Sequence, residues 1–172
     1  MKHRRRNQPY FLRDISADSM LAVMGGGKVS FEIPRGWVHK VKDYGLAFYD
    51  RQPPANDCIF EATLIINPPG PIRDFPVWKM LQETVSRDGH FIAEEDIVKQ
   101  YRGDTEVAWL RYRQIHPSQD RIAVFNHSLI RGSGFHALFT YAYWPEEAER
   151  LAPVWTRALD SFEIGIPNPH PN

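Results

Sequence analysis

The sequence is short of several features that would point to a class of protein. It has one cysteine, Cys58, so no disulfide can form within the chain. The formal net charge is zero, because 21 lysines and arginines balance 21 aspartates and glutamates. No overall field would therefore attract nucleic acid or an anionic membrane surface. No apolar run reaches the roughly 18 residues that a membrane-spanning helix requires. We therefore predict no nucleic-acid partner and no membrane span.

The N-terminus begins with a basic segment, MKHRRRN, which resembles the start of a signal peptide. Arg13, Asp14 and Asp18 interrupt the stretch that follows, so it has no continuous apolar core, cleavage pattern or lipidation site. We expect a cytoplasmic protein.

The rest of the composition is that of a globular protein with a substantial core. The chain has 172 residues, of which 42% are hydrophobic and 13% aromatic. Rings in this number must enter a core or an interface, because they carry large apolar surfaces. The length suits one domain with tails.

Periodicity predicts an α+β fold, an antiparallel β-sheet with helices packed on it. Asp74 caps a predicted helix that continues to Gly89, with Val77, Leu81 and Val85 on one face and Trp78 beside it. A second helix follows Pro145, and we expect Pro153 to kink it. A short helix capped by Ser16 is predicted within ISADSMLAVM. Alternating or apolar runs predict strands at 29–33, 46–50, 58–66, 106–115, 121–130 and 135–144.

The segment GGGK, residues 25–28, resembles part of a phosphate-binding loop. Such a loop has an earlier glycine at a fixed distance, a Ser or Thr after the lysine, and then a helix. Here Val29 follows Lys28 and a strand begins. The pattern favours a hinge or linker, since glycine supplies backbone freedom.

The motif VSFEIPRGW resembles the opening strand of the PsbP-like group, which includes the extrinsic photosystem subunit and the Ran-binding Mog-type proteins. The end of the chain is similar too, with an aromatic strand, a helix after a proline and the short strand in LDSFEI. The resemblance covers about residues 28–166 in element order. It implies an α/β/α sandwich and a non-catalytic adaptor or assembly role, and it carries over no catalytic residues. We predict an N-terminal extension over residues 1–27, partly flexible, one PsbP-like domain over 28–166 and a disordered tail over 167–172.

Residues with catalytic or metal-binding chemistry are present, but their spacing predicts no catalytic, metal or cofactor site. The seven histidines lack metal-binding spacing, and Ser133 and Cys58 lack the setting of a nucleophile. Consecutive acids at 94–96 are typical of a solvated loop. If RGSG places Ile130 opposite Phe135, His127 lies opposite Leu138 and becomes a diagonal neighbour of His136. A two-histidine metal site would need a third ligand and none is evident nearby, so the pattern favours core or interface histidines.

The strongest candidate for binding is one face of the predicted sheet. If Ile115 lies opposite Ile122, then Arg113, Arg111 and Trp109 lie opposite Val124, Asn126 and Ser128. The next strand adds Tyr141 to this face. Trp109, Arg111, Arg113, Asn126 and Tyr141 have the composition of a recognition patch. Alternatively, a helix covers this face and the arginine stems lie on the rings.

These observations favour a non-enzymatic module that binds another protein or supports assembly through this patch, extended by residues 9–24. A small-molecule carrier or enzyme is an alternative, with a pocket between sheet and helices lined by Trp78, Tyr112, His127 and Trp155. An accessory protein of a bacterial secretion or toxin-immunity system is a further alternative.

Overall fold

A computed structural model describes residues 10–67, 75–86 and 92–165. These residues form two compact units. The first combines the chain up to Gly36 with the chain from Pro153 onward, and the second runs from Trp37 to Ala152. The basic start of the chain, the predicted cap Asp74, the predicted helix end at Gly89 and the predicted tail at 167–172 lie outside the described residues.

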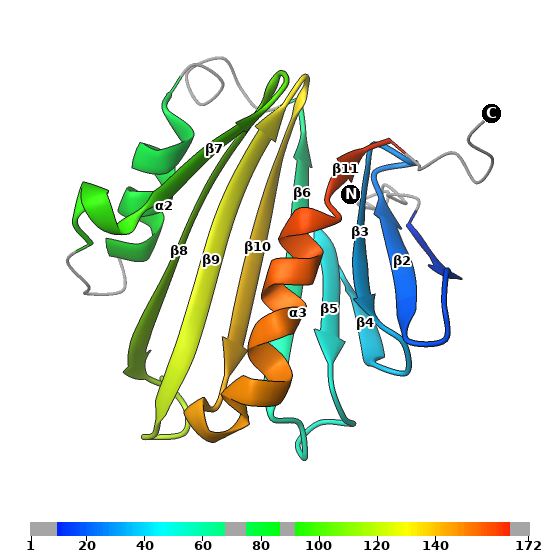
Figure 1. Cartoon of the computed structure of the whole chain (residues 1–172), viewed down its shortest axis with the longest axis vertical. Helices are drawn as coiled ribbons and strands as arrows, with labels where there is room; N and C mark the ends of the chain where they lie inside the picture. Colours follow the sequence, from blue (N-terminus) through cyan, green and yellow to red (C-terminus); the bar gives the residue numbers. More distant parts are fainter. Residues whose placement is uncertain (1–9, 68–74, 87–91, 166–172) are drawn as a thin grey trace, which may run out of the picture. The chain divides into compact units, whose positions relative to one another are not determined.

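The first unit is built on a four-stranded antiparallel sheet in the order β1-β2-β3-β11 (Figure 1). Its central strand β2 is buried along its whole length, whereas the edge strand β1 is mostly exposed. A strand buried on both faces reads as a continuous apolar run instead of an alternation. The strands are β1 (Phe11–Asp14), β2 (Ser19–Met24), β3 (Val29–Pro34) and β11 (Glu163–Ile164).

The prediction of a short helix in ISADSMLAVM is wrong, because this segment contains β2. Ser16 does accept backbone hydrogen bonds, as a capping residue would. Its hydroxyl oxygen accepts from the amides of Asp18 at 3.3 Å and Ser19 at 3.0 Å, which stabilises the turn between β1 and β2. A short apolar run does not distinguish a helix from a buried strand.

The GGGK segment is the turn between β2 and β3, so it lies within the sheet and is not a linker. Gly25, Gly26 and Gly27 have φ values of 63°, 67° and 90°. Residues with side chains rarely adopt this left-handed backbone, so three consecutive glycines suit the turn. The amide of Lys28 donates to the carbonyl of Met24 at 3.0 Å and closes it. The strand that follows leaves no helix terminus for a phosphate.

The predicted C-terminal helix is confirmed as α3 (Ala148–Asp160), preceded by the 3₁₀ turn η2 (Pro145–Glu147). The helix includes Pro153, and the division between the two units falls just before this residue. Its last turns are bonded within the first unit. Arg157 donates to the Ser19 hydroxyl at 3.2 Å, and the Ser161 hydroxyl accepts from the Glu32 amide at 2.8 Å.

The second unit is built on a seven-stranded sheet, antiparallel throughout, in the order β4-β5-β6-β10-β9-β8-β7 (Figure 1). The edge strands β4 and β7 are largely exposed and carry lysines and an arginine, which disfavour pairing with another strand. The strands are β4 (Val38–Lys42), β5 (Gly45–Tyr49), β6 (Cys58–Ile66), β7 (Val98–Arg102), β8 (Thr105–Ile115), β9 (Ile122–Gly132) and β10 (Phe135–Tyr143).

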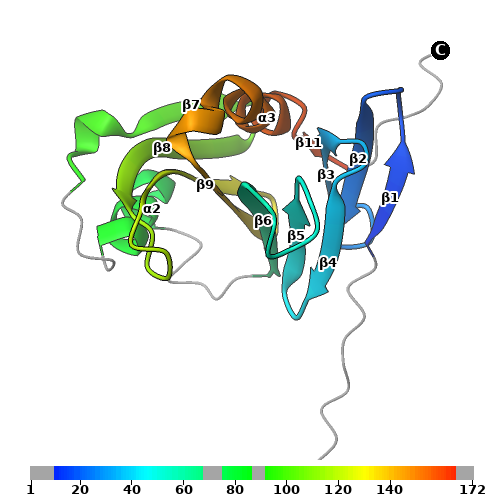
Figure 2. The same cartoon turned by 90° about the horizontal axis from the view of Figure 1, so that it is seen from below.

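Helix α2 (Val77–Ser86) packs on one face of this sheet over β8 and β9 (Figure 2). The predicted apolar face is confirmed, since Val77, Leu81 and Val85 are all fully buried. Burial of each such side chain contributes about 1.5–3 kcal/mol. The remaining buried members of this cluster are Ile92, Ile97, Ala108, Leu110 and Leu129. We call this side of the sheet the α2 face and the other side the opposite face.

The register of β8 and β9 is as predicted, with Arg111 opposite Asn126. The register of β9 and β10 is not, because Phe135 lies opposite Gly132, two residues from the predicted Ile130. A side chain at 132 would collide with the Phe135 ring, since an added Cβ would lie 2.3 Å from it. A shift of two residues keeps every side chain on its predicted face.

The two histidines are affected by this shift. His127 lies opposite Thr140 instead of Leu138, and His136 lies opposite Arg131. They share the α2 face but are not diagonal neighbours, so the predicted histidine pair is absent.

Candidate functional site

The predicted recognition patch divides into an exposed part and a buried part. Trp109, Arg111 and Arg113 share the opposite face along β8, where both arginines are exposed and the tryptophan is half-buried. Asn126 and Tyr141 share that face but are each 0% exposed. They therefore belong to the interior, and no exposed surface contains all five residues.

The buried Asn126 side chain holds the exposed Arg111 in place. Arg111 donates through Nε to the Asn126 side-chain oxygen at 2.7 Å, and the Asn126 amide group donates to the Tyr141 carbonyl at 3.4 Å. Because Arg111 uses Nε for this bond, its two terminal nitrogens stay available. The buried Asn126 side chain, bonded at both its oxygen and its nitrogen, holds the Arg111 guanidinium in place but does not neutralise its positive charge.

Tyr141 has a structural environment. Its hydroxyl donates to the Leu151 carbonyl in the first turn of α3 at 3.1 Å, and its ring lies 5.7 Å from the ring of Phe60. Burial raises the pKa of Tyr141 above its usual range, and the nearby Cys58 thiol adds to this effect. Burial and the nearby Asp50 carboxylate raise the pKa of Cys58 to about 12. Cys58 therefore stays a neutral buried thiol, in line with the expectation that it lacks the setting of a nucleophile.

The exposed part extends beyond the predicted residues. At the end of β8, Ile115 is 58% exposed and lies opposite Ile122, which is 55% exposed. At the other end, Val98 lies opposite Trp109 and is 37% exposed. We call these residues together the β8 strip: Val98, Trp109, Arg111, Arg113, Ile115 and Ile122.

The charges of the strip are open to a partner. Within the described part of the chain, Arg113 makes no hydrogen bond or ion pair. Arg111 is held only by the neutral Asn126 side chain among those residues. Two cations without a carboxylate partner beside exposed β-branched side chains form a surface suited to an acidic, partly apolar partner.

The residues of the alternative pocket belong to two compact units. Trp78 and Tyr112 pack partly against the α2 cluster, and the Tyr112 ring meets the edge of the His127 ring at 5.6 Å. The nitrogen of Lys99 lies 4.2 Å from the Trp78 ring centroid. Trp155 is buried and belongs to the first compact unit.

The α2 face instead carries a continuous row of half-buried rings that sequence analysis missed. From Tyr112 and His127 the row continues to Phe125, whose ring stacks on Tyr112 at 5.6 Å. It ends with His116 and Trp144. The His116 ring centroid lies 6.2 Å from that of Phe125 and 5.5 Å from that of Trp144. We call these five residues the aromatic row. His116 lies in a segment that sequence analysis treated only as a turn, and strand pairing alone brings it to the row.

The loop between β5 and β6 is anchored beside this row by an ion-pair network. The Asp50 side chain is 1% exposed and accepts from Arg150 at 2.9 Å and from the Asp57 amide at 2.9 Å. Burial would raise the pKa of Asp50, but the hydrogen bonds from Arg150 and from the amides of Asp57 and Cys58 outweigh it and lower the pKa. Asp57 also pairs with Arg51 and Arg150. The ionised Asp50 thus ties the loop to the start of α3.

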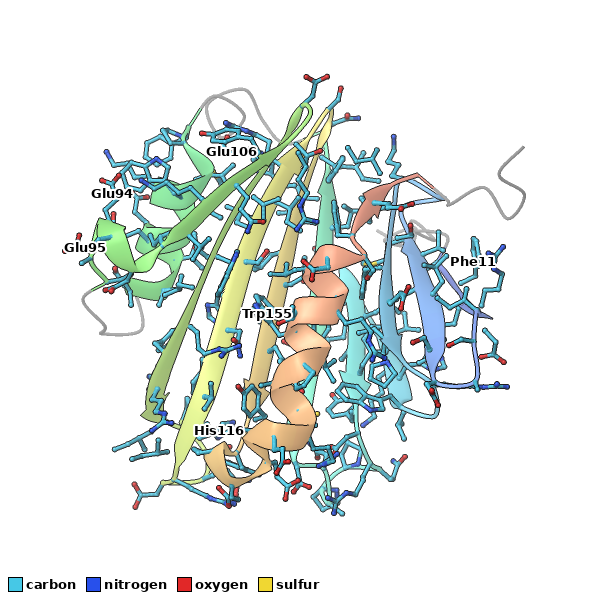
Figure 3. All side chains as sticks on the ribbon, in the orientation of Figure 1. Phe11, Glu94, Glu95, Glu106, His116 and Trp155 are labelled. Atoms are coloured by element: carbon cyan, nitrogen blue, oxygen red, sulfur yellow. The ribbon has the colours of Figure 1, made fainter. Side chains whose placement is uncertain are left out.

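At the other end of β8, Glu106 joins α2 to the sheet (Figure 3). Its carboxylate pairs with Arg131 and accepts from the Val77 amide in the first turn of α2 at 3.3 Å. Arg131 also donates to the Phe75 carbonyl at 2.8 Å. His136, opposite Arg131, is 2% exposed. Burial and the Arg131 charge lower the pKa of His136, against a smaller opposite effect of Glu106.

The other candidates have ordinary surroundings. Glu94 and Glu95 lie in an exposed 3₁₀ turn, η1 (Glu94–Asp96), beside α2 (Figure 3), where Glu94 pairs with Lys99. Ser133 lies in the exposed turn between β9 and β10. Across residues 10–67, 75–86 and 92–165, no three His, Cys, Asp or Glu side chains gather as metal ligands. None of the helices that the structure describes is long and apolar enough to cross a membrane.

Comparisons with solved structures show a PsbP-like fold. The cyanobacterial PsbP protein (CyanoP) of Synechocystis sp. PCC 6803 matches with a TM-score of 0.59 and 14% identity, over 87% of this chain and 94% of that one. A chain from Bacteroides thetaiotaomicron VPI-5482 matches with a TM-score of 0.56 and 9% identity, over 81% of this chain. This chain spans only 46% of that longer one. These matches confirm the α+β fold, with mostly antiparallel strands and two helices, and at such identity they show the fold alone.

Sequence comparison shows the family. The protein alr1449 of Nostoc sp. (strain PCC 7120) is 27% identical over 146 residues, which are 84% of this chain and 76% of that protein. The family model named Alr1449 matches residues 20–167, a span that includes β2, both α-helices and the seven-stranded sheet. The chain therefore belongs to the Alr1449 family and has a PsbP-like fold.

Proposed function

We propose that the chain is a non-enzymatic protein-binding or assembly module that contacts its partner through the β8 strip. The observation that carries the proposal is the pair Arg111 and Arg113. Both are exposed, neither meets a carboxylate within the described residues, and one is fixed by the buried Asn126. An arginine held in place loses less side-chain entropy when it binds a carboxylate.

The apolar members of the strip support a protein partner. Ile115 and Ile122 lie opposite each other and are each more than half exposed, although isoleucine is among the residue types most often buried. Together with Trp109 they provide apolar area beside the two cations. Interfaces combine such an apolar centre with arginine and aromatic residues. The expected partner surface therefore carries carboxylates beside apolar side chains.

The resemblance to the PsbP-like group supports the same proposal, because it implies an adaptor or assembly role. The resemblance to Ran-binding Mog-type proteins stays a prediction, and the binding role proposed for the β8 strip does not depend on it. Fold similarity alone does not determine a partner, so the proposal rests on the strip itself.

Site-specific crosslinking in cells that express the chain natively would test the proposal. A photo-crosslinking phenylalanine analogue replaces Ile122 within the strip. In a second version it replaces Tyr44, which is 72% exposed and lies outside the strip. We expect one protein to be crosslinked from position 122 and not from position 44, as identified by mass spectrometry.

Charge variants complete the test. Arg111→Ala/Arg113→Ala should abolish the crosslink from position 122. The control Lys28→Ala/Lys40→Ala removes the same charge from exposed positions elsewhere and should preserve it. Equal crosslinking from positions 122 and 44, or no effect of the strip variant, would contradict the proposal.

A further inference from the structure

A small open pocket lies at the end of the aromatic row, on the α2 face but outside the cluster that α2 buries. Its enclosed volume is about 40 Å³, and the rest of the depression opens to solvent. Sites for drug-sized ligands usually enclose roughly 300–1,000 Å³, so this pocket suits a smaller group. The residues that line it are Asn56, Asp57, Cys58, Ile59, His116, Ala123, Ala142, Tyr143 and Trp144.

The pocket is hollow because its floor is made of small side chains. Ala142 on β10 lies between Ile59 of β6 and Phe125 of β9 in the register of the sheet. Ala123, also at the floor, is 1% exposed. Two alanines among larger neighbours leave a depression that the surrounding rings border without filling. The floor is therefore apolar and nearly flat, as a sheet surface is.

The aromatic walls of the pocket are held in place. The His116 ring stacks on Phe125, and its Nδ1 accepts from the Ser118 amide at 3.3 Å. With Nδ1 accepting this bond, Nε2 carries the ring proton and makes no hydrogen bond to the residues that the structure describes. The Arg121 guanidinium lies 4.3 Å from the centroid of the Trp144 ring and pairs with Glu146. Figure 3 shows His116 at the end of β8 remote from Glu106.

The charges around the pocket are already neutralised. Asp57 pairs with Arg51 and Arg150, and Arg121 pairs with Glu146. A charged ligand would have to break one of these pairs to gain a partner, whereas a neutral ligand would not. Two ring walls, a flat apolar floor and one available N–H donor remain for recognition.

We propose that this pocket binds a single uncharged planar aromatic ring. The ring would lie on Ala123 and Ala142 and contact the rings of His116 and Trp144. Offset or edge contacts between rings favour this shape over a saturated group of the same size. A ligand of this size gives a dissociation constant on the order of 0.1–1 mM. The ring can belong to a free small molecule or to an aromatic side chain, and the experiment separates these sources.

The test is a titration of the ¹⁵N-labelled full chain followed by NMR. Benzyl alcohol is the aromatic probe, and cyclohexylmethanol is its saturated counterpart. We expect benzyl alcohol to shift the amide signals of residues 116, 142 and 144 in a saturable manner, with at least tenfold weaker binding of cyclohexylmethanol. Equal binding of the two, or benzyl alcohol shifts confined to other residues, overturns the proposal.

Two variants locate the site. Ala142→Leu fills the floor and should weaken benzyl alcohol binding at least tenfold. Thr140→Leu makes a similar change on the same face of β10 outside the pocket and should leave binding within twofold of the unmodified chain. If Ala142→Leu loses its dispersed amide spectrum, His116→Ala replaces it, because His116 is half-buried at the end of β8. Unchanged binding in a folded variant of either kind overturns the proposal.

A second probe separates the two sources of the ring. N-acetyl-tryptophanamide presents an aromatic side chain on a peptide backbone, and indole presents the ring alone. Binding of N-acetyl-tryptophanamide at least as tight as that of indole assigns the pocket to a partner's side chain. Binding of indole alone assigns it to a free small molecule. Binding of neither overturns the proposal.

Discussion

The two sides of strand β8 differ in chemistry, although their residues alternate along the same short segment, residues 109–115. Trp109, Arg111 and Arg113 lie on the opposite face, where the arginines are exposed at the margin of a buried interior. Tyr112 lies on the α2 face, where its ring joins a half-buried row of aromatic side chains. The strand thus provides a cationic surface on one side and an uncharged aromatic surface on the other.

This difference follows from how deeply each face is buried toward the centre of the sheet. On the opposite face, Phe60, Phe139 and Tyr141 are each 0% exposed. On the α2 face, helix α2 covers β8 and β9 only in part, so that Phe125 and His127 remain half-buried. We infer that the opposite face contributes more to the stability of the second unit. The α2 face keeps accessible rings near its pocket.

The largest expected effect comes from removing one phenylalanine ring on each face. Phe139→Ala should lower the free energy of unfolding by about 3–5 kcal/mol, because the ring is fully buried and its centroid lies 5.4 Å from that of the Phe60 ring. Phe125→Ala should cost less, about 1–2 kcal/mol, because part of this ring is already in water. Urea unfolding followed by circular dichroism measures both. Equal losses would remove the difference between the faces.

The next effect concerns the two amide side chains of this strand pair. Asn126→Ala should lower the free energy of unfolding by about 1–3 kcal/mol, because it removes a buried group that bonds Arg111 and the Tyr141 carbonyl. Gln114→Ala, on the α2 face, should change it by less than about 0.5 kcal/mol, since Gln114 is only half-buried. Thermal and urea unfolding of both variants provide the comparison. A larger loss for Gln114→Ala would contradict the assignment of Asn126 as the buried support.

Acid should act on the α2 face through His136. Its folded-state pKa is below the ordinary 6.5, so its neutral form is complete in both states well above that value. As the pH falls below about 6.5, the unfolded chain binds the proton first, and stability decreases until the lower folded-state pKa is passed. One such group contributes a slope of at most about 1.4 kcal/mol per pH unit.

The measurement is the free energy of unfolding of the wild type and of His136→Gln between pH 7.5 and 5. We expect the wild type to lose more stability than the variant across this interval. Parallel curves would show that His136 does not titrate differently in the two states.

The smallest expected effect on stability belongs to the β8 strip. Arg113→Ala should change the free energy of unfolding by less than about 0.5 kcal/mol, because its guanidinium group is exposed. Arg111→Ala should lower it by about 1 kcal/mol, because it also removes the donor to the Asn126 side-chain oxygen. Differential scanning calorimetry of the single variants would measure this. A loss above about 2 kcal/mol for either would show that the strip serves folding instead of recognition.

Much of the fold could be predicted from residue patterns. The alternation in 106–115 and the run in 58–66 gave strands whose bounds lie within one residue of β8 and β6. The helical spacing of Val77, Leu81 and Val85 gave the buried face of α2. These segments were predictable because burial on one side imposes a period of 2 or 3.6 on the sequence.

The errors occurred where this periodicity is absent. Strand β2 is buried on both sides, so its apolar run carried no period and was predicted as a helix. The pairing of β9 with β10 was predicted two residues out of register, because the fit of the Phe135 ring against Gly132 depends on the folded sheet. The short edge strands β4 and β7 are mostly exposed and left no apolar signal.

The sequence by itself determined the antiparallel α+β class and the face on which each residue of β8 lies. These properties depend on local period and composition, which the chain carries at every position. Only the tertiary structure decided that Asn126 and Tyr141 are interior, and that His116, Phe125 and Trp144 meet at a pocket. Such outcomes depend on which distant segments cover a face or leave it open, because a strand's pattern records which side is apolar but not what lies against it.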